Sequence, residues 1–225
     1  MIRILSPRCF LKQTCSNLST VHVAGKNEVP LQNSVKQFYL FPAPMVTTPS
    51  FELWRSIGNT VAKVAYSRYE PQYTDKGFIN GSKQAISLIA KAIREQNNEL
   101  ISSLSLKRLS YALFDRLKDF PPEFLQTRFS FDENNIIHGF FHSCIMSNDR
   151  SFSLDISEMA FFGTVVAIID PNSTKPVPIS EALKDVNSQT LFCNITVCRR
   201  INPLGPWKIS HINFFDDASR KSLQS

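Results

Sequence analysis

The apolar residues of this chain change their spacing near its middle, at Pro121 and Pro122. Before this pair they recur every three or four residues, which is the spacing of one face of an α-helix. After it they gather in short runs rich in β-branched and aromatic residues, which is typical of strands. Because helices come first and consecutive strands follow, we predict an α+β domain with N-terminal helices packed on a curved antiparallel sheet.

Helical spacing is clearest in three stretches. The first covers 51–69 and carries one apolar stripe along its length. The residues of this stripe are Leu53, Trp54, Ile57, Val61, Val64 and Ala65. A second helix is predicted over about 78–96, and one or two further helices over 100–117.

The second part of the chain contains five β-rich runs separated by turn residues. They are 128–132, 136–146, 160–169, 190–200 and 207–215. The polar residues 132–135 predict a hairpin turn between the first two runs. Residues 171–178 are predicted to form a loop, and 179–186 either a short helical turn or the tip of a hairpin.

The N-terminal segment 1–30 contains Arg3, Arg8 and Lys12 and has no acidic residue before Glu28. A basic, acid-free segment that can fold as an amphipathic helix is typical of a mitochondrial presequence. The apolar residues of this segment never join into the run that a secretory signal requires. We therefore predict a presequence over 1–30 and a location in the mitochondrial matrix.

Pro42, Pro44 and Pro49 predict a linker over 31–50, which leaves one domain over 51–220. The net charge is +6, and residues 1–50 hold five basic and one acidic residue, which makes +4. The remaining 175 residues carry 20 basic and 18 acidic side chains, a net of only +2. This small excess is not typical of a protein embedded deeply in ribosomal RNA.

The most distinctive stretch connects the first two predicted helices. It reads Tyr69-Glu70-Pro71-Gln72-Tyr73, and Phe78 and then Gly81-Ser82-Lys83-Gln84-Ala85 follow it. Near the end of the chain, Trp207-Lys208-Ile209 opens the last β-rich run. These stretches resemble the m-AAA protease-interacting protein family of mitochondria. The resemblance covers about 50–215, and the residues that carry it are Tyr69, Pro71, Tyr73, Phe78, Gly81, Lys83, Gln84 and Trp207.

That family belongs to a wider group that includes the import-motor anchor of the inner membrane and a mitoribosomal large-subunit protein. The resemblance implies a cone-shaped fold like that of nuclear transport factor and ketosteroid isomerase. It also implies a non-catalytic matrix adaptor that associates with m-AAA protease subunits and assists newly imported inner-membrane proteins, such as the calcium uniporter regulatory subunit. The alternative is a large-subunit protein of the mitoribosome, or a tether between the ribosome and the inner membrane.

Catalytic and metal-binding motifs receive little support from the sequence. His138 and His142 are four residues apart, and on a strand this separates their rings by ~13 Å, too far to share a metal ion. Asp155, Glu158 and Asp170 lie near turns or strand ends, where a carboxylate is usually solvated. No nucleophile elbow, phosphate-binding glycine loop or paired-cysteine motif occurs. We therefore expect no catalytic residue, metal or cofactor.

The first predicted helix is the best candidate for a contact surface. Trp54 lies among apolar residues, and Arg55, Lys63 and Arg68 accompany the stripe. A tryptophan beside basic residues suits either a partner protein or the anionic surface of the inner membrane. The alternative is that the stripe packs on the sheet and belongs to the core.

Overall fold

The computed structural model describes residues 37–49, 52–147 and 159–222. The predicted presequence, 1–30, and the candidate acids Asp155 and Glu158 lie outside the described residues. The elements are, in order, α2 (Leu53–Ser67), α3 (Asp75–Arg94), α4 (Asn98–Leu104), α5 (Lys107–Leu117), α6 (Pro122–Arg128), the 3-10 helix η2 (Glu133–Asn135), β1 (His138–Ser147), β2 (Ala160–Ile169), α7 (Ile179–Ala182), β3 (Leu191–Arg200), β4 (Lys208–Phe215) and α8 (Asp217–Ser222).

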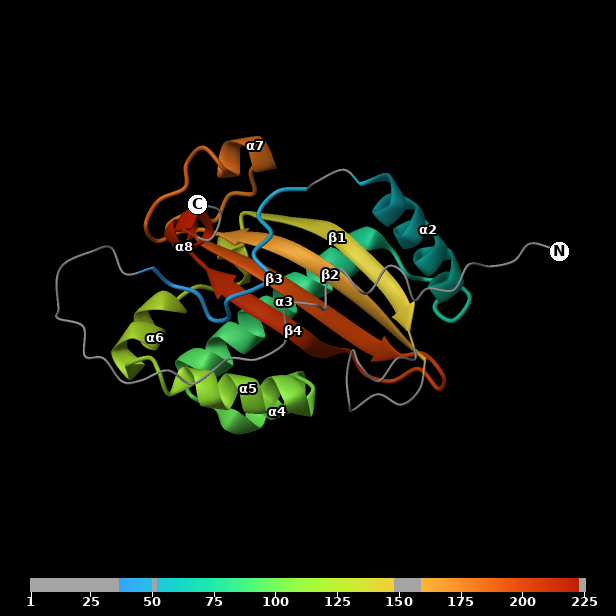
Figure 1. Ribbon diagram of the computed structural model, residues 1–225, viewed down its shortest axis with the longest axis horizontal. Coiled ribbons are helices and arrows are strands. Elements are labelled where there is room, and N and C mark those ends of the chain that lie inside the picture. The colour runs from blue at the N-terminus through green and yellow to red at the C-terminus, as the bar shows by residue number, and fades with distance from the viewer. Residues whose placement is uncertain (1–36, 50–51, 148–158, 223–225) are drawn as a thin grey trace. The chain divides into compact units, whose positions relative to one another are not determined.

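The four strands form one antiparallel sheet in the order β1-β2-β3-β4. Strand β1 pairs with β2 from His138 opposite Ile168 to Ser147 opposite Ala160, with a register shift between Phe141 and Ser143. The helices of the first part of the chain pack against this sheet (Figure 1). The predicted α+β class, with N-terminal helices on an antiparallel sheet, is therefore confirmed.

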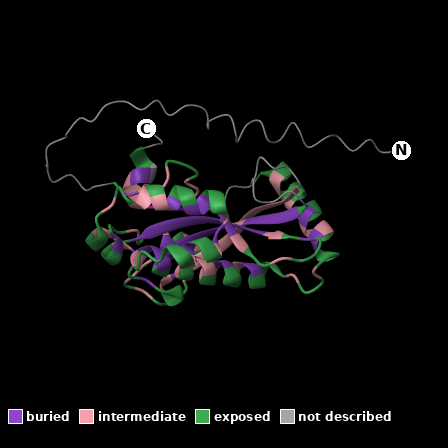
Figure 2. Ribbon diagram, turned by 90° about the horizontal axis from the view of Figure 1, so that it is seen from below, coloured by how far each residue is buried: buried purple, intermediate pink, exposed green. Residues whose placement is uncertain are grey.

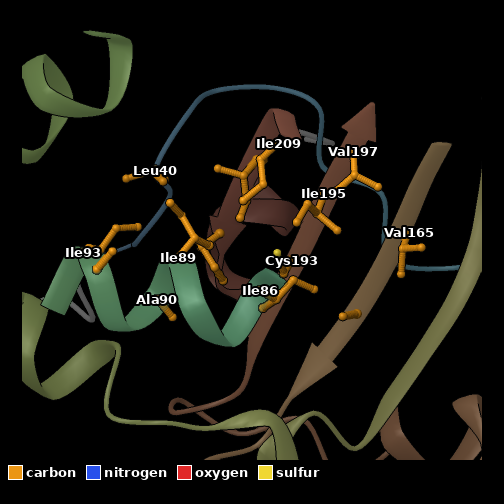
Figure 3. Close-up of a cluster of buried hydrophobic side chains, with 14 of the residues drawn as sticks. Leu40, Ile86, Ile89, Ala90, Ile93, Val165, Cys193, Ile195, Val197 and Ile209 are labelled. Atoms are coloured by element: carbon orange, nitrogen blue, oxygen red, sulfur yellow. The ribbon is translucent and has the colours of Figure 1, made fainter. Parts of the chain in front are cut away.

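Helix α3 forms the centre of the core because its apolar side lies on the sheet. Ile86, Ile89 and Ile93 are fully buried, and Figure 3 shows Ile86 beside Cys193 of β3 and Ile93 near Leu40. Burial is concentrated in the sheet and in the helix turns that face it, while the outer turns are exposed (Figure 2). Burying each such isoleucine stabilises the fold by about 1.5–3 kcal/mol.

Both ends of α3 are closed by local hydrogen bonds. The Thr74 side chain accepts a bond from the Gly77 N–H at the start of the helix. At its end Gln96 adopts a left-handed conformation with φ of 51°, and the Asn97 N–H reaches back to the Ala92 carbonyl at 2.9 Å. The left-handed Gln96 and the bond from Asn97 to the Ala92 carbonyl end the helix, because they turn the backbone away from the helical path.

Residues 37–49, predicted to belong to a linker, are part of the fold. The side chains of Phe38 and Leu40 are 3% and 0% exposed and join the main core. Two buried amides hold the segment on the sheet: Asn213 bonds both backbone groups of Phe41 at 2.9 Å, and Asn194 bonds both of Val46 at 2.7 Å. The prolines therefore mark an extended segment bound by side-chain amides, and the domain begins before Phe51.

The β-rich runs 136–146, 160–169, 190–200 and 207–215 correspond closely to β1, β2, β3 and β4. The prediction of a strand over 128–132 is wrong, and so is the hairpin turn after it. Here Phe129 and Phe131 alternate with exposed residues and pack on Phe214, but none of the strands that the structure describes pairs with them. Alternation of apolar and polar residues indicates which side of an extended segment is buried. It does not indicate whether a neighbouring strand hydrogen-bonds to that segment.

Two short helices follow β2 and β4. Residues 179–186 were predicted to form either a helical turn or the tip of a hairpin, and the structure shows the helical turn α7, whose Ala182 is buried. Helix α8 follows β4 directly and was not predicted. Its start is fixed by Asp216, whose carboxylate accepts bonds from the N–H groups of Phe38 and Ser219.

The Phe78 ring lies directly over Gly163 of β2, where an added Cβ would come within 2.3 Å of the ring. We expect Gly163→Ala to lower the free energy of unfolding by about 1–3 kcal/mol, because the core must shift to admit the methyl group. The measurement is urea denaturation followed by circular dichroism. Gly81→Ala is the control, since an added Cβ there meets nothing within 4 Å. We expect it to raise the free energy of unfolding by about 0.5–1 kcal/mol, because alanine favours the helical conformation of α3. Equal stability of the Gly163→Ala variant and the native chain would contradict this account.

Candidate functional site

The apolar stripe of α2 faces solvent. Its exposed residues, here called the α2 apolar face, are Leu53 at 58%, Trp54 at 67%, Ile57 at 46%, Val61 at 63% and Val64 at 56% exposed. The alternative in which this stripe packs on the sheet is therefore wrong. Figure 1 shows α2 beside β1, the first strand of the sheet.

The side of α2 that meets β1 is largely polar. Arg55 Nη1 lies 3.3 Å from Glu52 Oε1 and 3.3 Å from His142 Nε2. Lys63 Nζ lies 2.6 Å from Asp75 Oδ2 and 3.9 Å from the centre of the Phe141 ring. Two of the three cations predicted to accompany Trp54 at a contact surface therefore point inward, and both have acidic partners.

The side chain of Asn59 covers the outer edge of β1. Its Oδ1 accepts a hydrogen bond of 2.8 Å from the Cys144 N–H, and its Nδ2 donates to the His142 carbonyl at 3.3 Å. One amide thus takes the donor and acceptor positions that a neighbouring strand would use. Edge strands with free backbone groups are prone to pair with other chains, so Asn59 protects this edge while it orients α2.

The C-terminal turn of α2 is held by Tyr66, which is fully buried. Its ring stacks on Phe161 of β2 with centroids 4.2 Å apart. The Tyr66 hydroxyl donates to Glu70 Oε2 at 2.6 Å, and Glu70 Oε1 accepts from Arg199 Nη1 at 2.8 Å. Burial, and then the bond to Glu70, raise the pKa of Tyr66 far above its ordinary value. This anchor fixes the rotation of α2 about its axis.

The residues that carry the family resemblance surround this anchor or lie in α3. Tyr73 and Phe78 contact the Phe161 ring, and Trp207 contacts the rings of Tyr66 and Phe161. Tyr69, Pro71, Gly81 and Gln84 are exposed, while Lys83 Nζ donates to the Ile136 carbonyl at 3.2 Å. Most of the distinctive stretch therefore builds the junction between α2 and α3.

A cavity of about 140 Å³ lies between the first half of α2 and β1. Arg55 and Asn59 line it from the helix, and Phe140, Phe141 and His142 line it from the strand. Its lining is polar enough, and its volume large enough, for a few water molecules. The first half of α2 is thus held by polar contacts around a cavity, whereas the second half is held by the Tyr66 anchor.

His142 is the titratable group at this interface. A guanidinium can only donate, so Nε2 accepts from Arg55 and the neutral ring carries its proton on Nδ1, 3.1 Å from Ser143 Oγ. Burial lowers the pKa of His142, Arg55 lowers it further, and Glu52 opposes them. The ring is therefore neutral near pH 7.

Of the residues predicted to form a contact surface, Trp54 and Arg68 are exposed, while Arg55 and Lys63 lie against the sheet. The structure thus separates a predicted set of four into two sides of one helix. The sequence reasoning missed Asn59, although Arg55, Asn59 and Lys63 follow one another at helical spacing and form a polar stripe of their own.

Reactive groups are scarce in the part of the chain that the structure describes. Burial raises the pKa of the Cys144 thiol to about 12 and that of Cys193 well above its ordinary value, so neither is a thiolate near pH 7. Within 37–49, 52–147 and 159–222, no group of three or more His, Cys, Asp or Glu side chains is arranged to hold a metal ion. None of the described helices is long and apolar enough to cross a bilayer.

Comparison with known proteins found no match, either among protein-family models or among curated sequences.

The free energy of unfolding is expected to fall as the pH drops below about 6.5, the ordinary pKa of histidine. The pKa values of His142 and His211 are lowered by burial and by nearby arginines. The unfolded chain therefore binds protons before the folded protein does, and acid favours unfolding. His142→Gln should reduce the loss of stability between about pH 8 and pH 5, and adding His211→Gln should reduce it further. Urea denaturation across this range tests the prediction, and the same pH dependence in all three proteins would refute it.

Proposed function

We propose that this protein is a non-catalytic adaptor of the mitochondrial matrix. It associates with the m-AAA protease at the inner membrane and assists the maturation or assembly of inner-membrane proteins, such as the calcium uniporter regulatory subunit. The observation that carries this proposal is the α2 apolar face, a row of five large hydrophobic side chains that point away from the core.

An outward apolar face of this kind is costly unless something covers it. Burying a Leu, Ile or Val side chain contributes about 1.5–3 kcal/mol, and α2 leaves such residues 46–63% exposed. Their spacing along one helix makes the exposed surface contiguous, and contiguous apolar patches mark sites of interaction. A helix face supplies no nucleophile or proton donor, so it supports binding rather than catalysis.

The mitochondrial part of the proposal rests on the sequence. The basic, acid-free segment 1–30 supports import into the matrix. The resemblance to the m-AAA protease-interacting family supports the choice of partner. Three residues of that resemblance, Tyr73, Phe78 and Trp207, pack around the Tyr66 anchor that sets the orientation of the α2 apolar face.

Affinity capture tests the proposal. The full chain carrying a C-terminal tag is captured from mitochondria in mild detergent, and co-purifying m-AAA subunits are quantified. Ile57→Asp places a charge in the centre of the α2 apolar face, and we expect it to reduce m-AAA capture by about tenfold or more, since it removes an apolar contact and buries a charge. Leu88→Asp is the matched control, because Leu88 of α3 is 45% exposed, as Ile57 is 46% exposed.

Both variants change exposed residues, so their thermal unfolding should match that of the native chain. Equal capture of m-AAA subunits by the native and Ile57→Asp chains would remove α2 from the mechanism. Capture of large-subunit ribosomal proteins in place of m-AAA subunits, with release at high salt, would replace the adaptor with the ribosomal alternative. Salt-resistant binding to anionic vesicles alone would make the inner membrane the partner.

A further inference from the structure

The residues of the α2 apolar face follow a heptad pattern. Trp54, Ile57, Val61 and Val64 are separated by three, four and three residues, as the a and d positions of a coiled coil are. All four are 46–67% exposed. We call these four residues the α2 seam. A seam of this spacing takes the side chains of a second helix lying along it, at a crossing angle near +20°.

The residues that flank the seam are small or uncharged. Gly58 and Ala65 lie at the e positions on one side, and Leu53 and Thr60 lie at the g positions on the other. Water-soluble coiled coils usually carry Glu and Lys at e and g, where charges select the partner. Nothing meets an added Cβ within 4 Å of Gly58, so the fold does not require a glycine there. Glycine in mid-helix costs about 0.5–1 kcal/mol relative to alanine. A residue as small as glycine or alanine at this position lets a partner helix come close, whereas a large side chain would block it.

The charges on α2 argue against a lipid surface as the main occupant. Helices that bind anionic lipid keep their Lys and Arg at the water–lipid boundary. In α2, Arg55 and Lys63 face β1 and contact Glu52 and Asp75. Arg68 remains exposed at the end of the helix, one heptad after Val61. The face is therefore apolar along its length, with one cation at its C-terminal end.

We propose that the α2 seam binds one α-helix of a partner protein, packed lengthwise, whose contacting side is apolar and without charge along its flanks. A carboxylate at the end of that helix would meet Arg68. The inference rests on the proposed function and names the chemistry of the surface that the adaptor recognises. From Trp54 to Val64 the seam spans about 15 Å, at 1.5 Å per residue, so it offers three turns to the partner and predicts modest affinity.

Two soluble helical peptides of three heptads test the proposal. Both carry Leu at a and d and charged residues at b, c and f; one has Ala at every e and g position, and the other has Glu there. Each is labelled with a dye, and its binding to the full chain is followed by fluorescence anisotropy. Trp54 emission in a Trp207→Phe chain then reports where the peptide binds, since the protein has two tryptophans.

We expect the peptide with Ala flanks to bind and to shift Trp54 emission to shorter wavelength. The Glu-flanked peptide should bind about tenfold more weakly or not at all, because its charges would be buried without partners. Gly58→Leu should also weaken binding by about tenfold, because its side chain would block close approach of the helices. Gly58→Ala and Leu88→Asp should bind as the native chain does.

The Gly58→Leu variant distinguishes helix packing in the α2 seam from nonspecific binding of apolar material. If the face binds apolar material without geometry, the added leucine strengthens binding, and this result would overturn the proposal. Binding to phosphatidylglycerol vesicles with no binding to the peptides would assign the face to lipid. A concentration-dependent Trp54 shift without peptide would assign it to a second copy of the chain. Capture of m-AAA subunits is measured separately from each of these results. The proposed adaptor function is therefore retained if m-AAA capture succeeds, even when the proposal for the α2 seam is overturned.

Discussion

The stacking of Tyr66 on Phe161 decides which side of α2 meets the sheet. This ring is fully buried, and its hydroxyl is bonded to Glu70, which in turn pairs with Arg199. Since a helix is rigid, one buried ring near its end sets the direction of every other side chain along it. Two and three turns earlier, the same rotation brings Asn59 and Arg55 to the edge of β1 and sends the larger apolar residues outward.

The resulting helix is inverted with respect to the usual rule. Amphipathic helices on globular proteins bury their apolar side, whereas α2 uses polar contacts inward and leaves its apolar side to solvent. The inward contacts are satisfied individually, which lowers the cost of burying polar groups. The arrangement stabilises the helix on the domain through one set of residues and leaves another, apolar set exposed.

The strands were largely predictable because each of the four observed strands alternates or runs apolar between turn residues. The failure at 128–132 came from Phe129 and Phe131, which are buried although their connecting segment pairs with none of the described strands. The segment around Phe38 was missed because its backbone is bonded by Asn194 and Asn213, more than 140 residues away in the chain. Side-chain amides that bond distant backbone leave no periodic signal in a sequence.

The sequence by itself determined that a helix with one apolar stripe, observed as Leu53–Ser67, precedes a sheet. The polar residues Arg55, Asn59 and Lys63 of the same helix are also at helical spacing in the sequence. Only the tertiary structure decided which stripe faces the protein. Helical periodicity sorts residues by side, but the choice of side depends on partners far along the chain: Phe161, Arg199 and the backbone groups of β1. Trp54 and Arg55 are neighbours in sequence, but Trp54 is exposed to solvent and Arg55 contacts β1, because successive side chains on a helix are about 100° apart.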